Sequence, residues 1–329
     1  HIRTPNIMVE EVFKRVRIDI KGLGQQEPVE ISKLTTSFYF FRKGNTLDTD
    51  EDGIPDDIDQ CKYEKGLVEL NGCPYDNTIL VEGGVFNMGS PDAKDNAPIH
   101  SVSLKAFYIS KYEVTFEEYD AFCDATSRKK PHDENYGRGK RPVFNVNWYD
   151  AIEYCNWLSK KYGFDECYRI DKTRKDPNNL NDADNLKWIV TCDFNATGYR
   201  LPSEAEWEFA ARGGNLGKNT LYSGGDQSER IAWFSGDNTK KTMPVGQKKA
   251  NELGLFDMRG NVWEWCWDIY AYYDKPTSKF SARIDRGGSW GDPGAKTTVR
   301  GAAPPHYRGQ DEPYHLYGHI GFRIARSKP

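Results

Sequence analysis

The chain has 329 residues, of which 37% are hydrophobic, and its formal net charge at neutral pH is -4. A chain of this length can bury one large core or two to three smaller ones, and its 9 Trp, 19 Tyr and 16 Phe residues supply bulky side chains for them. The balanced charge gives no reason to expect a nucleic-acid partner or an anionic membrane surface. No apolar run approaches the roughly 20 residues that a membrane span requires, so no such span is expected.

The first segment is residues 1–44. Apolar residues recur at helical spacing from Ile7 to Ile20 and predict an amphipathic helix, and Ser37–Phe41 predicts a buried strand. A helix and a strand cannot bury a core alone, so we expect this piece to end a larger domain. The runs PNIMVEEVFKRVRIDI, GQQEP and SFYF resemble the C-terminal end of bacterial caspase-like peptidase domains. That resemblance implies that the catalytic His and Cys lie upstream, so this chain is not expected to be a peptidase.

The second segment, residues 45–78, contains the run DTDEDGIPDDID. Its aspartates and Gly53 have the spacing of a calcium loop, and carboxylates packed this closely repel one another without a cation. The alternative is a solvated acidic linker. With the continuation CKYEKGLVELNGCP, the segment resembles a thrombospondin type 3 repeat, which implies a spacer with structural calcium and a Cys61–Cys73 disulfide. The candidate ligands are Asp48, Asp50, Asp52, Asp56 and Asp59.

The other cysteines leave two alternatives open. Cys167 and Cys192 bracket a polar insertion and could close a loop in an oxidising compartment. Cys123, Cys155 and Cys266 lie in apolar periodic stretches, where buried free thiols are expected as readily as bonded ones. The calcium spacer and the possible disulfides favour the cell envelope or the extracellular space.

The third segment, residues 79–329, is the large domain. The stretch from Val81 to Gly89 predicts a strand that leads into a glycine turn. Helix starts follow Thr115, Asn147 and Ser203, and the first and last of these caps have Glu three residues further on, as in a capping box. Short strand-like runs separated by Gly, Pro and Asn complete the pattern. The predicted class is therefore α+β with much irregular structure.

Motifs of this segment resemble the formylglycine-generating-enzyme, or sulfatase-modifying-factor, superfamily. They are FNMGS, YEVTFEEYDAFC, GYRLPSEAEWEFAARGG, GLFDMRGNVWEWCWD, RGGSW and IGFRIA, in the family's order. The resemblance implies a fold related to C-type lectins and a structural calcium bound by Asp257, the carbonyls of Gly260 and Val262, and Glu264. The alternative for this turn is a hydrogen-bonded loop without metal.

The chain departs from the family at the oxidase cysteines. The active oxidases use two cysteines between RGGS and GFR to bind copper and to engage a substrate thiol, and no other side chain easily replaces a thiolate there. Alignment of the run Arg300–Ala303 places Lys296 and Gly301 at the two cysteine positions, and no Cys follows Cys266. We therefore expect no copper and no catalytic residue in this segment.

A candidate binding surface lies between the RGGSW and GFR motifs. Its irregular mixture of aromatic and small polar residues is typical of adaptable recognition loops, whereas the alternative is an ordinary surface loop. Variable proteins of diversity-generating retroelements share this fold and diversify the stretch before GFR, so the chain also resembles them. The candidate ligand-binding residues are Trp290, Asp292, His306, Tyr307, Tyr314, His315, Tyr317 and His319.

The leading hypothesis is a non-catalytic domain that recognises an unknown protein or cell-surface ligand, tethered by a calcium spacer to a caspase-like peptidase whose missing portion is a possible partner. A structural component of the envelope or of a secretion system, built on the same fold, is the first alternative. A copper-dependent oxidase with displaced ligands is the second.

Overall fold

The computed structural model divides the chain into two units, His1–Asp76 and Asn77–Pro329. It describes residues 77–328, with gaps at 91–97, 183, 219, 221, 238–239, 272–281, 293–299 and 304–318, together with Leu47, Thr49, Ile54 and Pro55. The helix and strand predicted in residues 1–44 and the five aspartates of the predicted calcium spacer lie outside the described residues. None of the described helices is long and apolar enough to cross a membrane.

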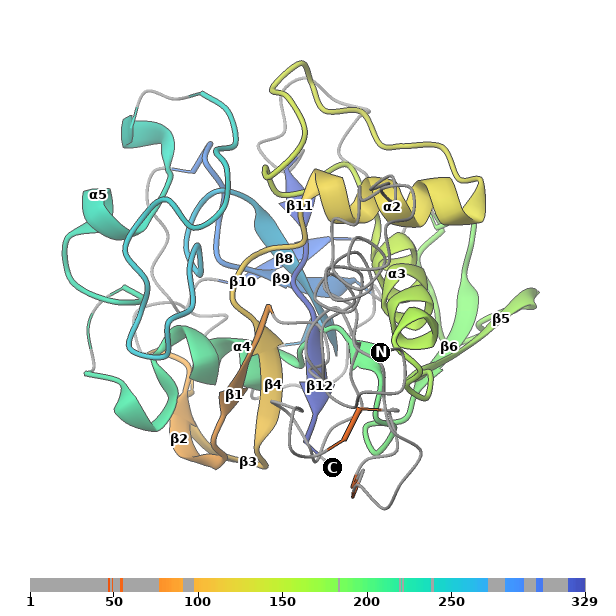
Figure 1. Cartoon of the computed structure of the whole chain (residues 1–329), viewed down its shortest axis with the longest axis horizontal. Helices are drawn as coiled ribbons and strands as arrows, with labels where there is room; N and C mark the ends of the chain where they lie inside the picture. The colour runs from red at the N-terminus through yellow and green to blue at the C-terminus, as the bar shows by residue number, and fades with distance from the viewer. Residues whose placement is uncertain are drawn as a thin grey trace, which may run out of the picture. The chain divides into compact units, whose positions relative to one another are not determined.

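The second unit combines short sheets with a few helices (Figure 1). One sheet has the order β1-β4-β12-β7 and brings the last described strand between strands from the first half of the unit. Its members are β1 (Thr78–Val81), β4 (Phe107–Ser110), β12 (Ala325–Ser327) and β7 (Tyr199–Arg200). The sequence predicted one strand from Val81 to Gly89, but the chain breaks at Glu82 and Gly83. It resumes as β2 (Gly84–Met88), which pairs with β3 (His100–Leu104).

A second sheet, of order β10-β9-β8-β11, carries the motifs that the sequence singled out. Strand β8 holds the WEWCWD run, and the short β11 lies parallel to it, so that the GFR motif is beside the WEW motif. The strands are β10 (Arg300–Ala303), β9 (Arg283–Arg286), β8 (Trp263–Ile269) and β11 (Ile320–Gly321). A separate hairpin consists of β5 (Tyr168–Lys175) and β6 (Trp188–Cys192).

Three helices begin at the caps that the sequence predicted. They are α2 (Phe116–Thr126), α3 (Trp148–Lys161) and α4 (Glu204–Ala211). Thr115 and Ser203 form capping boxes with Glu118 and Glu206, and Asn147 forms one with Asp150. Each box satisfies backbone N–H groups that the first turn of a helix leaves without partners. Shorter helical turns are η2 (Gly214–Leu216), α5 (Ser228–Ile231) and η3 (Ser235–Asp237).

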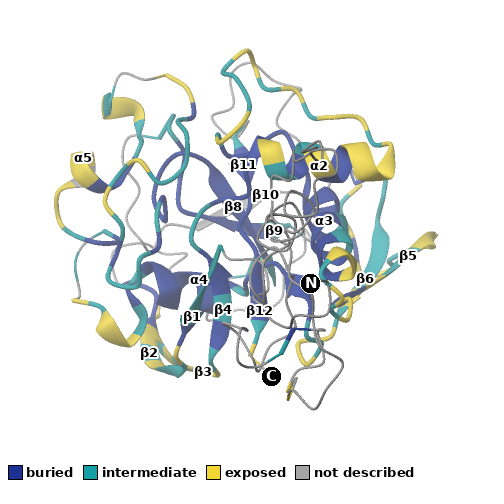
Figure 2. Ribbon diagram, in the orientation of Figure 1, coloured by how far each residue is buried: buried dark blue, intermediate teal, exposed yellow. Residues whose placement is uncertain are grey.

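The hydrophobic core lies where α4 packs against the sheets, and both α4 and β8 are largely buried (Figure 2). Phe107 and Ile109 of β4 contribute from one sheet, Ile284 of β9 from the other, and Trp207 of α4 fills the space between them. A second cluster of rings, Tyr119, Phe122 and Tyr154, joins α2 to α3 and is completed by Phe322 of the GFR motif. These mixed helices and small sheets confirm the predicted α+β class.

Candidate binding surface

The RGGSW turn fixes Trp290 and Asp292. Gly287 and Gly288 adopt φ angles of 95° and 76°, which glycine reaches without strain, and the chain turns there directly after β9. The backbone N–H and the hydroxyl of Ser289 both donate to Asp292 Oδ2, at 2.6 and 2.7 Å. The backbone N–H of Trp290 donates to the carbonyl of Asn261 at 3.0 Å. Both predicted site residues are therefore held by the backbone of the turn.

His319 is fixed from the other side of the same region. Its carbonyl accepts a hydrogen bond from the backbone N–H of Trp263 at 2.9 Å, where β11 begins to pair with β8. Its imidazole contacts the indole of Trp290 edge to face, with ring centroids 4.8 Å apart. Two of the predicted ligand-binding residues, which are 29 positions apart in the chain, are thus brought into contact.

Two further rings complete this group, and no sequence pattern predicted them. Tyr136 lies 5.9 Å from Trp290 and 6.0 Å from His319, and buried Phe144 lies 5.5 Å from His319. We call Tyr136, Phe144, Trp290 and His319 the aromatic surface. Tyr136, Trp290 and His319 are half-buried, so the aromatic surface combines a buried base with rings that solvent reaches.

The segment that carries Tyr136 and Phe144 has an unusual backbone. Glu134, Asn135 and Asn145 adopt left-handed conformations with φ between 49° and 58°. The side-chain amide of Asn145 donates to the carbonyl of His132 and to Glu134 Oε1, each at 3.0 Å. These bonds offset the cost of the left-handed residues and hold the two ends of the segment together. Neither ring lies in an apolar pattern of helix or strand, so only the folded chain reveals their position.

The electrostatics of the aromatic surface are those of a neutral ring system beside carboxylates. Burial lowers the pKa of His319 to about 4, although the nearby Glu134 acts to raise it. The imidazole is therefore uncharged near neutral pH and contributes a ring rather than a positive charge. Among the described residues, no Lys or Arg lies over the rings of Tyr136, Trp290 or His319.

Asp285 is a second feature that the sequence did not reveal. Asp285 is 1% exposed, and neither of its carboxyl oxygens has a hydrogen-bond partner among the described residues. Burial raises the pKa of Asp285 to about 8; the charge of Asp292 acts in the same direction, whereas the backbone N–H of Asp285 itself and the charge of Arg286 act to lower it. The signal in the sequence was an acid in the strand-like run RIDR directly before RGGSW.

The predicted calcium turn forms a buried acidic centre with one arginine. Both oxygens of Glu264 accept from Arg323, at 2.6 and 2.7 Å, and Trp207 Nε1 also donates to Glu264 at 2.6 Å. Asp257 accepts from the backbone N–H of Gly246, while its other oxygen has no partner among the described residues. Burial and neighbouring carboxylates raise the pKa of Glu113 well above its usual value.

This centre fits a calcium ion only in part. The unpartnered oxygen of Asp257 and the carbonyls of Gly260 and Val262 are hard donors of the type that calcium prefers. Glu264, in contrast, already accepts three hydrogen bonds, two from Arg323 and one from Trp207. Within the described ranges, no three His, Cys, Asp or Glu side chains are arranged to hold a metal ion. The hydrogen-bonded loop, which the sequence left open as the alternative, therefore accounts for Glu264.

The described cysteines are free thiols, and Cys167 and Cys192 are not joined. Burial raises the pKa of Cys266 well above its usual value, and it raises the pKa of Cys167 to about 11 and that of Cys192 to about 12. Thiols of this kind are protonated at neutral pH and are poor nucleophiles and poor ligands for soft metals. The buried ones, Cys123, Cys155, Cys167 and Cys266, behave as small apolar side chains of the core.

Other predicted site residues cannot be placed. His306, Tyr307, Tyr314, His315 and Tyr317 lie outside the described residues, as do Lys296 and the five aspartates of the spacer. Gly301 belongs to β10 and pairs with Asp285.

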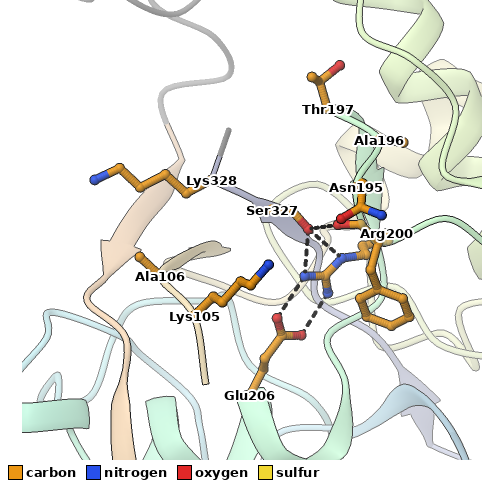
Figure 3. A pocket seen from close by; sticks show the side chains of 10 residues that line it. Lys105, Ala106, Asn195, Ala196, Thr197, Arg200, Glu206, Ser327 and Lys328 are labelled. Atoms are coloured by element: carbon orange, nitrogen blue, oxygen red, sulfur yellow. Dashed lines mark hydrogen bonds and ion pairs between the residues drawn. The ribbon is translucent and has the colours of Figure 1, made fainter. Parts of the chain in front are cut away.

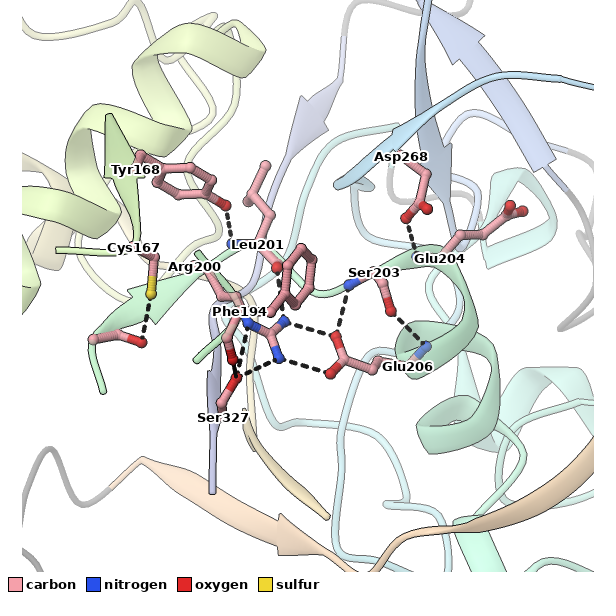
Figure 4. A network of polar contacts seen from close by, with 11 residues as sticks. Cys167, Tyr168, Phe194, Arg200, Leu201, Ser203, Glu204, Glu206, Asp268 and Ser327 are labelled. Atoms are coloured by element: carbon pink, nitrogen blue, oxygen red, sulfur yellow. Dashed lines mark hydrogen bonds and ion pairs between the residues drawn. The ribbon is translucent and has the colours of Figure 1, made fainter. Parts of the chain in front are cut away.

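Two hollows accompany the domain. One has a volume of about 690 Å³ and is lined by residues of the segment that carries Tyr136, among them His132, Arg138 and Asn145. The other, of about 440 Å³, lies beside Lys105, Arg200 and Lys328 (Figure 3). The guanidinium of Arg200 is saturated there, because it donates to both oxygens of Glu206 and to Ser327 (Figure 4). That pair stabilises the start of α4 and leaves no donor for a ligand.

The fold, the paired WEW and GFR motifs and the RGGSW turn define a sulfatase-modifying-factor domain. The chain belongs to this family: the model of the sulfatase-modifying factor enzyme 1-like domain matches residues 64–328, which begins within the predicted spacer. The predicted family is therefore confirmed.

Three relatives show how the family varies. The chaperone protein LppX of Paenibacillus barcinonensis is 40% identical over 77% of this chain and 90% of its own. The formylglycine-generating enzyme of Streptomyces coelicolor is 30% identical over 79% and 89% of the two chains. Among solved structures, Treponema denticola variable protein 1 has a TM-score of 0.63 and 31% identity, covering 76% of this chain and 95% of its own. Chlamydial serine/threonine-protein kinases also match, and this chain spans 38% of their length.

Proposed function

We propose that the domain is a non-catalytic recognition module that binds a protein or cell-surface ligand at the aromatic surface and along the adjoining stretch up to His319. The observation that carries this proposal is the contact between Trp290 and His319, which brings the two ends of that stretch together beside Tyr136. Rigid rings supply large contact areas at a low cost in conformational entropy, so they serve as anchors of recognition surfaces.

The chemistry of the domain supports binding rather than oxidation. The segment that carries two cysteines in the active oxidases has none here, and all the described thiols except half-buried Cys192 are buried. Similarity to a variable protein of the same fold supports the same function, with diversification of the stretch before GFR. A neighbouring near-repeat of the DNA for residues 290–322, with adenines at the mismatches, would test this diversification directly.

The proposal is tested by display selection on the full chain. A random dodecapeptide library on phage is selected against the wild-type protein and against Trp290→Ala and Tyr136→Ala. We expect enriched peptides whose binding falls at least about tenfold in either variant, as for the anchors of other interfaces. Phe194→Ala is the matched control, because Phe194 is 38% exposed and packs against Trp267, away from the aromatic surface. Equal binding by all four proteins would refute the assignment of the surface.

We also propose two calcium sites, both structural. One uses the aspartates of the spacer, whose spacing supports it, and the other uses Asp257 with the carbonyls of Gly260 and Val262. The unpartnered oxygen of buried Asp257 supports the second site. Isothermal titration of the chelator-treated full chain with calcium tests both: we expect Asp257→Asn to remove one binding event and Asp50→Asn with Asp52→Asn to remove the other.

The link to a caspase-like peptidase, and a location in the envelope or outside the cell, rest on the sequence of residues 1–78. Coupling would mean that ligand binding changes the rate of peptide cleavage by the parent protein. Measurement of that rate with and without an enriched peptide is the test, and an unchanged rate would contradict the coupling.

A further inference from the structure

The hollow of about 690 Å³ borders the aromatic surface. Most of its wall comes from the connection between α2 and α3, the same segment that carries Tyr136 and Phe144. Asp133 lines the hollow, and its carbonyl accepts a hydrogen bond from the backbone N–H of Tyr136 at 2.8 Å. Asn145 also lines it and follows Phe144 directly. A ligand that covers the rings can therefore extend into the hollow.

Cationic side chains outnumber carboxylates in the lining of this hollow. The cations are Arg128, Lys129, Lys130 and Arg138. The carboxylates are Asp133 and Asp150, and both already accept hydrogen bonds from the backbone. Asp133 accepts from the N–H of Gly137 at 3.2 Å, and Asp150 accepts from the N–H of Asn147 at 3.0 Å, within the capping box of α3. The acids of the lining are therefore engaged in holding the chain, and the surplus charge of the lining is positive.

The two arginines are fixed by acids of the neighbouring helices. Arg128 donates to Asp150 at 3.2 Å and to Glu153 at 2.7 Å, both on α3. Arg138 donates to both carboxyl oxygens of Asp120 on α2, and its guanidinium also donates to the carbonyl of Pro131 at 2.9 Å. A guanidinium has more N–H groups than these bonds use. Both arginines are thus oriented in advance, so that little conformational entropy is lost when an anion binds.

The two lysines are less firmly neutralised than the arginines. Lys130 lies 2.9 Å from Asp124, but the two side chains are 42% and 68% exposed, and an ion pair so open to water is weak. Lys129 is exposed and forms no ion pair with any described residue, although its carbonyl accepts from the thiol of Cys123 at 3.8 Å. The chain is therefore anchored at this point while the ammonium groups remain accessible to an anion.

We propose that the ligand of the aromatic surface carries an acidic side chain, aspartate or glutamate, and that the hollow receives this carboxylate on Lys129 and Lys130. The inference rests on the proposed recognition function and adds the chemical class of the group that the ligand presents. Charge-assisted hydrogen bonds of this kind are stronger than neutral ones, and the fixed arginines supply further N–H donors. The net charge of the whole chain is -4, so a preference for acidic ligands has to arise from a local site.

The same library tests the inference. Peptides selected by the wild-type full chain should contain aspartate or glutamate more often than the input, and the double variant Lys129→Gln with Lys130→Gln should return that frequency to the input value. Both lysines are exposed, so the double variant should fold as the wild type does. Lys105→Gln is the matched control, because Lys105 is also exposed but lines the other hollow (Figure 3). The control should select acidic peptides as the wild type does.

One enriched peptide then gives a quantitative answer. Replacement of its aspartate by asparagine, or of its glutamate by glutamine, should lower affinity for the wild type at least about tenfold and for the double variant less than about twofold, as coupled groups do in a double-mutant cycle. Enriched peptides without an acidic preference, or a preference that survives in the double variant, would overturn this inference and leave the recognition function intact. A preference that Lys105→Gln abolishes as well would also overturn it, since the cause would then be general charge. If no peptide is enriched even by the wild type, both proposals fall.

Discussion

The unpaired acid at Asp285 predicts an unusual dependence of stability on pH. Burial raises its pKa from a usual value of 3.8 to about 8; Asp292 raises it further, while the backbone N–H of Asp285 and the charge of Arg286 lower it. Its direct pairing partners on the neighbouring strands, Trp265 and Gly301, are uncharged. The folded state therefore keeps a proton that the unfolded state releases above about pH 4. The stabilisation that this proton contributes is complete below that pH and is lost as the pH rises toward about 8.

The magnitude follows from proton linkage. One proton held only by the folded state gives a slope of at most about 1.4 kcal/mol per pH unit, or about 2.7 kcal/mol between about pH 5 and about pH 7. Asp285→Leu removes this proton and adds an apolar side chain beside Trp265. We expect it to be more stable than the wild type near pH 7, with an advantage that shrinks as the pH falls.

Urea unfolding of both proteins at several values between about pH 5 and about pH 7.5 measures this difference, because the other titrating groups cancel between the two curves. Asp268→Asn serves as the control: its pKa is raised only to about 6, so its curve should run parallel to that of the wild type above that pH. Parallel curves for the wild type and Asp285→Leu across the whole range would refute the reasoning, since they would mean that Asp285 is ionised or paired in the folded protein.

Three further substitutions test the scaffold by urea unfolding. Arg323→Met should cost about 3–5 kcal/mol, because it leaves Glu264 buried without its partner, and a loss below about 1 kcal/mol would contradict the pair. Gly321→Ala should cost about 1–3 kcal/mol, since its Cβ would lie 2.2 Å from the carbonyl oxygen of Val143; an unchanged midpoint would show that the two segments separate easily. Ser203→Ala should cost about 1 kcal/mol through loss of the α4 cap, whereas Ser203→Asp should restore most of it, and equal stability of both would exclude the cap.

The features predicted correctly from the sequence are those with local causes. The caps at Thr115 and Ser203 were predicted because a capping box is complete within four residues. The family was predicted because its motifs occur as contiguous strings. The break at Glu82 was not predicted, since the strand ends through pairing with β4, a partner more than twenty residues away. Pairing partners of this kind are not written in a local pattern.

The residues of the aromatic surface also divide into those that a local motif predicts and those that only the fold brings into place. Trp290 and His319 were predicted from their motifs, but Tyr136 and Phe144 come from a segment whose left-handed residues have no apolar period. Asp285 was missed because an acid in a strand-like run usually faces solvent. Only the folded structure, in which β9 lies between β8 and β10, shows that it is buried.

Side chains alternate along strand β8 and so divide between the two faces of the sheet. Glu264 and Cys266 project from one face, where Glu264 pairs with Arg323 and receives a bond from Trp207, so that face joins α4 to the GFR motif. Trp263 and Trp265 project from the other, which also carries Asp285. We therefore expect substitutions on the second face to leave the buried ion pair on the first intact. The network that stabilises the sheet from the first face, Glu264 with Arg323 and Trp207, therefore uses none of the side chains of the second face.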